Sequence, residues 1–427
     1  MNFMIHASNE LILGIELREE YAQITYYHQS VKEPLTLAGV QGTDQYQLPM
    51  ALRQGADGRW QFWDGAPQMD GEDRDLCRIS DLFGKLFRQE PIRTGSESLE
   101  PARILSVYFQ LCLAQLKLLT QNTKVQVMVT VKELTEELGE VIAEALVGCG
   151  IDRKQIYVQD YLSSFYYYTV NQKKELWYQD VALLTYEEEA IVGYILHIDR
   201  STKPALATAE KIARQPMDDS VRAGRSDQDW NREKDRLFFE LLKKVFERRT
   251  VSVSYLMGDY FNKSWAERSI QYLCYKRHAF QGMNLYSKGA CYAAMERAGL
   301  IGDRGILFKG RDMITVNLGM EMRIRGKESY YTLIEAGINW YEAHHVCEFI
   351  PDNEREIRLV SKGLAEGDVV VHSMRLPHMP ARPNRASKLR MTVYFSSPIH
   401  CHVELEDLGF GEMYKPSGQV WKREICF

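Results

Sequence analysis

Hydrophobic and polar residues follow each other along the chain in patterns that predict short strands and amphipathic helices. Near the start, Leu11–Leu17 and Tyr21–Tyr27 are β-type runs on either side of Arg18-Glu19-Glu20, which predicts a hairpin. Two further short strands are expected on either side of Asp57-Gly58, a dipeptide typical of a tight hairpin turn. The chain is therefore expected to begin with a β-meander.

Helices and single strands alternate from about residue 99 to residue 300. Apolar residues recur at helical spacing in several segments. These predicted helices are Leu99–Thr120, Leu134–Val147, Phe165–Val170, Leu237–Arg248, Ser269–Tyr275 and Asn284–Met295. The runs VQVMVTV, IYVQD and VSVSYLMG are expected to be buried strands between them, and VALLTYEEEAIVGYILHID a second hairpin with Tyr186–Glu189 at its turn. This alternation predicts an α/β fold.

Two segments depart from this alternation. The stretch from about 199 to 236 is polar and rich in charge, which indicates a mobile connection or a reduced subdomain. From about Gly305 the pattern is strand after strand, with a helix expected only around Ile338–His345. Alternation in the last strands predicts a half-buried antiparallel sheet with eight residues inward: Leu389, Met391, Val393, Phe395, Ile399, Cys401, Val403 and Leu405. We place a domain boundary near residue 305.

Composition narrows the class of protein. The chain has 427 residues, 45% of them hydrophobic and 26% charged, which is ordinary for a soluble globular protein. A net charge of −5 without a basic stripe argues against a nucleic-acid partner. The eight cysteines are scattered and form no CxxC pair, and neither a signal peptide nor a run of about 20 apolar residues is evident. We expect a cytoplasmic protein without a membrane span, whose oligomeric state the sequence does not predict.

The order of these parts resembles the actin and Hsp70-type ATPase superfamily. In that fold two similar lobes each begin with a glycine-rich hairpin that binds phosphates, and the nucleotide lies between the lobes. LILGIELREEYAQITYY is similar to the first phosphate hairpin and VALLTYEEEAIVGYILHID stands where the second belongs. VSVSYLMGDYF matches the adenosine-loop strand in position, and NLYSKGACYAAM the Gly-Ala-Ala helix that follows it.

The resemblance implies a particular domain organisation. Residues 1–305 would form a two-lobed actin-like ATPase (ribonuclease H-like) fold, with lobe I at about 1–170, lobe II at about 171–305 and a reduced subdomain at about 199–236. Residues 306–427 resemble the peptide-binding β-sandwich of Hsp70 chaperones. Their ending, LEDLGFGEMYKPSGQVW, is similar to that of a bacterial family that joins such lobes to such a sandwich. This part is therefore expected to bind a peptide or protein, with its sheet edges as candidates for strand addition.

The phosphate loops depart from the family's pattern. In the first hairpin Gly14 is kept and Glu16 stands where the family has its magnesium-side aspartate, but Arg18-Glu19-Glu20 replaces the glycine and hydroxyl residues. In the second, TYEEEA places Glu187, Glu188 and Glu189 where phosphates would bind. The cofactor-binding residues that the resemblance assigns are Gly14, Glu16, Arg18, Gly258, Asp259, Lys276 and Gly289, with no catalytic residue and no metal ligand.

These losses favour a binding or scaffold protein over an enzyme. Two like charges about 4 Å apart repel by about 1 kcal/mol even in water, so three glutamates would oppose a polyphosphate. We expect a degenerate cleft that does not hydrolyse ATP, although ATP or ADP with Mg²⁺ is the cofactor that an intact family member would bind. The alternatives are an active ATPase with altered phosphate loops and, less in keeping with the appended sandwich, a filament or cell-shape assembly factor. The acidic turn is either a solvated hairpin tip or a holder of Mg²⁺ or Ca²⁺.

Gly289 raises a separate question, because an interior glycine costs a helix about 1 kcal/mol relative to alanine. With Ala290, Ala293 and Ala294 it would form a bare face. The resemblance places this face near the second lobe's sheet and the adenosine loop, whereas plain helix–sheet packing would need no ligand.

The remaining groups each have two interpretations. Lys276-Arg277-His278 is a basic patch that would contact an anion near the cleft or simply be solvated, and the aromatic run Phe165–Tyr168 would line the cleft or the core. The sets His344-His345-x-Cys347 and His400, His402 and Glu404 could bind a metal weakly, but surface roles are simpler. The basic, proline-rich loop HMPARPNRASK is a candidate for recognition.

Overall fold

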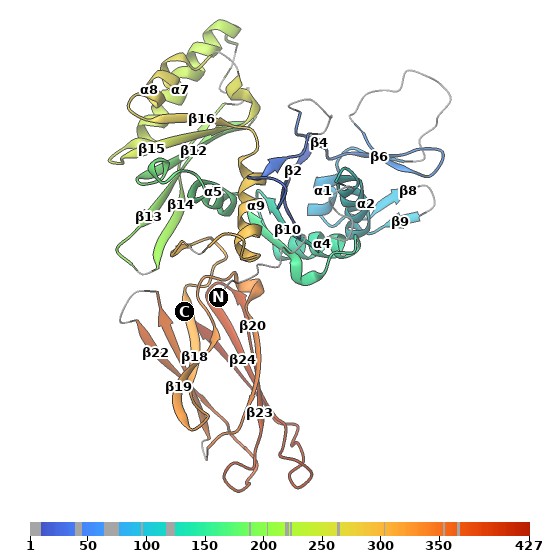
Figure 1. The fold of residues 1–427 in the computed structure, drawn as a ribbon, viewed down its shortest axis with the longest axis vertical. Helices are drawn as coiled ribbons and strands as arrows, with labels where there is room; N and C mark the ends of the chain where they lie inside the picture. The colour runs from blue at the N-terminus through green and yellow to red at the C-terminus, as the bar shows by residue number, and fades with distance from the viewer. Residues whose placement is uncertain are drawn as a thin grey trace. The chain divides into compact units, whose positions relative to one another are not determined.

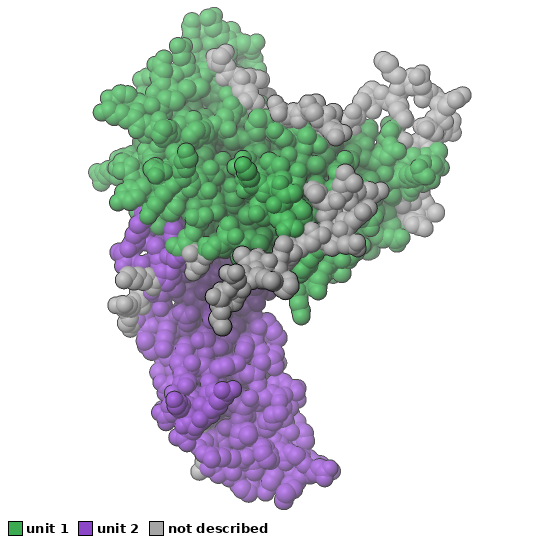
Figure 2. All heavy atoms as spheres, in the orientation of Figure 1, with its two compact units in different colours: residues 1–198, 209–304 green, residues 199–208, 305–427 purple. Residues whose placement is uncertain are grey.

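The computed structural model describes most of the chain and shows a mixed α/β protein. The described residues are 10–38, 45–63, 77–94, 97–116, 124–187, 189–202, 204–217, 222, 224–262, 265–302, 304–352, 355–364 and 368–427. They divide into two compact units, unit 1 with residues 1–198 and 209–304 and unit 2 with residues 199–208 and 305–427 (Figure 2). In the described residues, no helix combines the length and the apolar composition that crossing a membrane requires.

The first sheet of unit 1 has the strand order β11-β10-β1-β2-β3, with β4 also paired to β2. Strands β2, β4 and β10 of this sheet are labelled in Figure 1. Strand β1 runs antiparallel to β2 and parallel to β10, which is parallel to β11, so the predicted first hairpin is confirmed. The strands are β1 (Glu10–Leu17), β2 (Tyr21–His28), β3 (Leu35–Thr36), β4 (Leu48–Pro49), β10 (Lys124–Val131) and β11 (Ile156–Asp160).

Small strands and helices accompany this sheet. Gly58 has a positive φ of 78° in the turn between β5 and β6, as the Asp57-Gly58 pair predicts. The predicted helix at Leu134–Val147 begins two residues later, because Thr135 caps it by accepting a hydrogen bond from the N–H of Leu138. These elements are β5 (Leu52–Gln54), β6 (Trp60–Phe62), β7 (Cys77–Ile79), α1 (Leu82–Phe87), β8 (Ile92–Thr94), β9 (Glu97–Leu99), α2 (Pro101–Ala114), α4 (Glu136–Val147) and α5 (Tyr161–Val170).

The second sheet repeats this topology. Its order begins β16-β15-β12-β13-β14, with β12 antiparallel to β13 and parallel to β15, which is parallel to β16. In both sheets, therefore, the first strand of a hairpin lies beside two further strands that run parallel to it. The elements are β12 (Asp180–Glu187), β13 (Ala190–Asp199), β14 (Ala205–Pro216), α7 (Asp227–Phe246), β15 (Val251–Met257), α8 (Glu267–Cys274) and β16 (His278–Gly282). The second predicted hairpin is confirmed, and the two sheets of unit 1 share this strand pattern.

Helix α9 (Leu285–Arg297) packs on the first sheet, not on the second as the resemblance implied. Alternation along β1 turns Ile12 and Gly14 toward this helix. A side chain on Gly14 would lie 2.2 Å from the carbonyl oxygen of Ser287, and one on Gly289 would lie 1.9 Å from the carbonyl oxygen of Ser164 in α5. The two glycines thus let α9 touch the backbones of both β1 and α5.

Unit 2 contains two four-stranded sheets, ordered β19-β18-β21-β22 and β20-β23-β24-β25. Side chains of both sheets share one hydrophobic cluster, so they form a sandwich. Within this unit, residues 205–207 of β14 pair in parallel with β17. The strands are β17 (Ile306–Phe308), β18 (Val316–Ile324), β19 (Lys327–Ile334), β20 (His344–Phe349), β21 (Glu356–Gly363), β22 (Val369–Arg375), β23 (Leu389–Ser397), β24 (His400–Asp407) and β25 (Val420–Cys426).

The predicted inward residues of β23 and β24 are buried, with one exception. Ile399 is 48% exposed because it lies in the turn before β24 begins at His400. The helix expected around Ile338–His345 is only a 3₁₀ turn, Trp340–Glu342, followed directly by β20. Exposed and partly buried side chains alternate along β20, a pattern typical of a strand and not of a helix.

The polar stretch from 199 to 236 was expected to be a mobile connection or reduced subdomain, and its described residues are instead largely regular. Strand β14 occupies Ala205–Pro216, and α7 begins at Asp227, ten positions before the predicted Leu237. Ser226 caps α7, and Trp230, Lys234 and Phe238 continue its buried stripe toward the N-terminus. The high charge content masked this stripe. Part of the predicted helix Leu99–Thr120 lies outside the described residues, and α2 ends at Ala114.

Candidate functional site

Glu16 and Arg18 form an ion pair at the carboxyl end of β1. The Glu16 side chain is 1% exposed and the Arg18 side chain 17%, with Nε of Arg18 2.8 Å from Oε1 of Glu16. Glu16 is turned inward because it shares a face of β1 with Ile12 and Gly14, the face that α9 covers. Neither carboxylate oxygen accepts a hydrogen bond of normal geometry from a described residue, so Arg18 provides the compensation for this buried charge.

Two tyrosines contact the guanidinium of Arg18, and a third stacks on one of them. Nη1 of Arg18 donates to the hydroxyl of Tyr21 at 3.0 Å, and the guanidinium lies 5.3 Å from the ring centre of Tyr21 and 5.7 Å from that of Tyr161. Tyr161 stacks on Tyr286 of α9 with ring centres 4.1 Å apart, and its hydroxyl donates to the carbonyl of Leu17. Residues from β1, β2, α5 and α9 thus close over one cation.

Burial and charge act in opposite directions on this pair. Burial raises the pKa of the Glu16 carboxyl, and the nearby Arg18 only partly offsets that effect. Burial also disfavours the charged Arg18, but Glu16 and the tyrosines outweigh this and hold the pKa of Arg18 well above its ordinary value. Chemically, the site is a fixed cation that neutralises a carboxylate within the protein.

At the second hairpin, Glu187 is also paired internally. Its carboxylate forms an ion pair with Lys132, which follows β10 of the first sheet. The two side chains are 42% and 62% exposed, so the pair is solvated. Glu188, the middle residue of the predicted acidic cluster, lies outside the described residues. Among the residues that the structure does describe, no three histidine, cysteine or acidic side chains gather as a metal site.

Gly258 lies against the second hairpin. It has a positive φ of 111°, and a side chain there would come within 2.1 Å of the carbonyl oxygen of Tyr186. The Tyr186 ring is buried against Tyr260, Phe261 and Trp265, with ring centres 5.0–5.6 Å away. Aromatic side chains therefore fill the space around the carboxyl ends of β12 and β15. The side chain of Asp259 lies outside the described residues.

Lys276 lies at the other end of the strands from Gly258, so the structure does not bring it together with the other predicted site residues. Strand β16 is parallel to β15, with His278 opposite Val253 and Gly282 opposite Met257. Lys276 precedes His278 and so lies beyond the amino ends of these strands, whereas Gly258 follows their carboxyl ends. At about 3.3 Å per residue the two levels are roughly 20 Å apart. The neighbouring Arg277 lies over the rings of Phe246 and Tyr272 instead.

The other metal candidates have structural partners. His345 contacts the Tyr331 hydroxyl at 3.3 Å, while His344 points to the opposite face of the same strand, so the two cannot share an ion. His402 contacts Ser396 at 2.7 Å and Glu404 accepts from Lys422 at 2.7 Å.

The first half of the aromatic run Phe165–Tyr168 lies in the hydrophobic core. Phe165 and Tyr166 are 0% and 3% exposed, and Phe165 contacts the ring of Tyr255 on β15. Tyr168 contacts the same ring, with centres 5.3 Å apart. Helix α5 is thereby anchored to the second sheet by aromatic side chains.

Sequence reasoning missed Lys132, Tyr161 and Tyr286. Tyr161 directly follows the strand IYVQD and Tyr286 begins the glycine-containing helix, positions that place both near the ends of predicted elements. Their meeting with Arg18 depends on how α5 and α9 cross, which no local pattern reveals.

The architecture is that of a mixed α/β protein with a β-sandwich, and two protein-family models match the chain. Residues 33–309 match the model of the family of unknown function (DUF5716), C-terminal, and the chain belongs to this family. Residues 313–427 match a domain of unknown function (DUF8552). No curated protein matches the chain.

Proposed function

We propose that this protein is a chaperone-like binding or scaffold protein. In this proposal unit 1 is a two-lobed body of the actin and Hsp70 type with a degenerate, non-hydrolysing nucleotide site, and unit 2 binds a peptide or protein. The repeated sheet topology of unit 1 supports the two-lobed body, because the resemblance requires two similar halves that each begin with a hairpin. The sandwich of unit 2 supports the comparison with a peptide-binding β-domain.

One observation carries the functional part of the proposal. Glu16 stands where the resemblance expects the magnesium-side carboxylate, and the guanidinium of Arg18 lies 2.8 Å from it. Mg²⁺ needs oxygen ligands at about 2.0–2.1 Å in a near-octahedral arrangement. A guanidinium held on the carboxylate by Tyr21 and Tyr161 takes that position and supplies the charge that a metal would bring.

The second hairpin gives independent support. Glu187 is neutralised by Lys132, a cation that would otherwise be free to meet a phosphate. The backbone of Gly258 packs closely against the backbone of Tyr186. Glu16 of the first hairpin and Glu187 of the second are thus each paired with a cation of the protein itself, which suits a body that holds its shape without a nucleotide cycle.

Thermal melting of the full chain with and without Mg-ATP or Mg-ADP tests this function. At a ligand concentration 100 times Kd, binding adds about 2.7 kcal/mol of stability, which raises Tm measurably. We expect the same Tm with and without nucleotide, and no release of inorganic phosphate from ATP. An upward shift of Tm with Mg-ATP would contradict the degenerate site, and phosphate release that Glu16→Gln abolishes would favour the altered-loop ATPase.

A further inference from the structure

Strand β22 is an apolar edge of unit 2 with both faces open. It is the outer strand of the sheet β19-β18-β21-β22. Val369, Val370 and Val371 are 55%, 54% and 57% exposed. Successive side chains of a strand point to opposite faces, so exposure of all three means that neither face of the strand is covered here.

The backbone of β22 presents a row of groups directed away from the sheet. The N–H of Gly363 donates to the carbonyl of Asp368, and the N–H of Leu376 donates to that of Arg355. In an antiparallel pair such bonded positions alternate, so the even-numbered residues of β22 face β21. The N–H and C=O groups of the odd-numbered residues point outward, which offers another strand a ready template. These residues are Val369, Val371, Ser373 and Arg375.

The other edges of the sandwich carry the charges that normally discourage pairing. Strand β19 begins with Lys327-Glu328, β20 holds Glu348 in ion pairs with Lys388 and Arg390, and β25 holds Lys422 in an ion pair with Glu404. The first half of β22 has only valines. Of these edges, β22 is the one built to accept a strand.

The second half of this edge carries a net positive charge. Arg358 of β21 shares the outer face with Ser373 and Arg375, and so does Glu356, the one acidic residue there, which stands opposite Arg375. Arg355 precedes β21 and stands opposite Leu376. All three arginines are exposed, and in the described part of the chain no ion pair joins any of them to an acidic residue. An incoming strand that brings a carboxylate to this end would therefore be favoured electrostatically.

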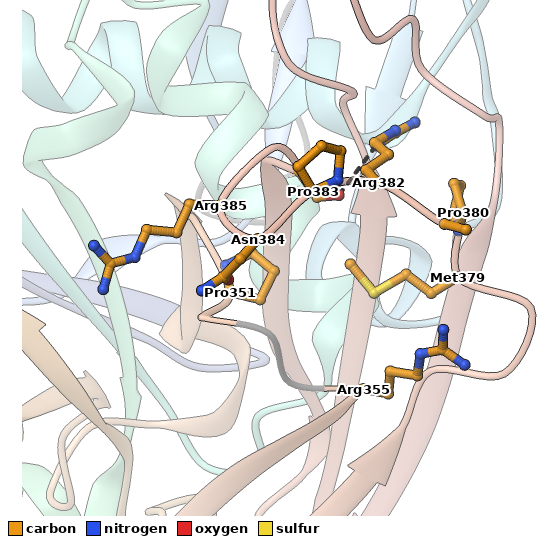
Figure 3. Close-up of a pocket in the computed structure, with 10 residues that line it drawn as sticks. Pro351, Arg355, Met379, Pro380, Arg382, Pro383, Asn384 and Arg385 are labelled. Carbon is orange, nitrogen blue, oxygen red and sulfur yellow. Dashed lines mark hydrogen bonds between the residues drawn. The ribbon is translucent and has the colours of Figure 1, made fainter.

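A pocket lies where the chain leaves β22 (Figure 3). It is lined by the basic, proline-rich loop together with Arg355 and Pro351. Two of its arginines are already neutralised, Arg382 by Asp407 and Arg385 by Asp352. Arg355 is the cation of the lining without such an ion pair in the described residues, so the pocket extends the positive end of the edge.

We propose that the β22 edge binds an extended segment of a partner protein by strand addition, with apolar residues beside Val369 and Val371 and an acidic residue beside Arg375, on the face that Arg358 shares. This inference rests on the proposed function for the binding role of unit 2 and names its site. An antiparallel segment of this kind has the acidic residue first and apolar residues at alternate positions after it. The backbone bonds supply affinity and the side chains supply selectivity.

A fluorescent peptide of sequence Glu-Thr-Ser-Thr-Val-Thr-Val, with blocked termini, tests the proposal by anisotropy with the full chain. Val371→Pro removes an outward N–H without removing a bond to β21, and we expect it to weaken binding about tenfold or more. Val420→Pro is the matched control, because Val420 begins β25, an edge strand of the other sheet, and its N–H also points outward. It should leave the affinity unchanged, and melting curves check that both variants fold.

A charge swap tests the acidic end of the segment. Arg375→Glu should weaken binding of this peptide about tenfold, and a peptide with lysine in place of glutamate should recover much of the loss. Equal binding by wild type and Val371→Pro would overturn the proposed edge while leaving unit 2 as a binding module. Absence of saturable binding to the wild-type chain would also overturn it. A concentration-dependent dimer that Val371→Pro abolishes would identify a second copy of this chain as the occupant and refute a foreign partner.

Discussion

Replacing Gly289 with alanine should destabilise the protein, although alanine is the better helix former. Helix propensity alone predicts a gain of about 1 kcal/mol for glycine to alanine inside a helix. In this structure the new Cβ would lie 1.9 Å from the carbonyl oxygen and 2.6 Å from the carbonyl carbon of Ser164, whereas ordinary contact begins near 3.4 Å. Helices α5 and α9 would have to separate by about 1.5 Å, and overpacking of this kind costs roughly 1–3 kcal/mol.

Gly139→Ala provides the matched control, because Gly139 also lies within a helix, α4, and its nearest neighbour would be a flexible methyl of Leu134 at 3.6 Å. We expect Gly139→Ala to be neutral or stabilising and Gly289→Ala to lower both Tm and the urea midpoint. Unfolding by urea, followed by circular dichroism, gives both free energies from the same assay. A Gly289→Ala protein as stable as the wild type would refute the close crossing of α5 and α9.

Two further perturbations probe the buried ion pairs. Arg18→Ala leaves the Glu16 carboxylate buried without its cation and should lower the free energy of unfolding in urea by roughly 3–5 kcal/mol. The Arg18→Ala/Glu16→Gln double variant should recover part of this loss. A loss below about 1 kcal/mol would show that the pair is not buried in solution. Asp407 accepts hydrogen bonds from Arg382 and Gly409, and these bonds outweigh burial, which alone would raise its pKa, so that the pKa is lowered. The stabilisation that Asp407 provides is therefore present above about pH 4 and lost as the pH falls further. Asp407→Asn should lower the free energy of unfolding by roughly 3–5 kcal/mol at pH 7 and flatten the acid side of a plot of stability against pH. An unchanged acid side would contradict this reasoning.

The candidate site could be predicted only in part. The resemblance grouped Gly14, Glu16 and Arg18 at the first hairpin, where the structure pairs Glu16 with Arg18, and Arg18-Glu19-Glu20 marked the hairpin turn. The place of Lys276 could not be predicted, because a basic triplet beside a strand does not reveal at which end of the strand it lies, and it lies at the end away from Gly258. Gly289 was recognised as a close approach, but its neighbour proved to be the backbone of α5.

The sequence by itself determined the elements and their repetition, because hydrophobic periodicity and turn chemistry act between residues only a few positions apart. From these local signals follow both hairpins, the buried strands after each and the change to an all-β region near residue 305. Only the tertiary structure decided which surfaces meet, because a bare helix face or a buried strand fits several partners equally well. The packing of α9 on the first sheet, the enclosure of Arg18 by Tyr161, and the unprotected edge at Val369–Val371 all depend on contacts between residues far apart in the chain.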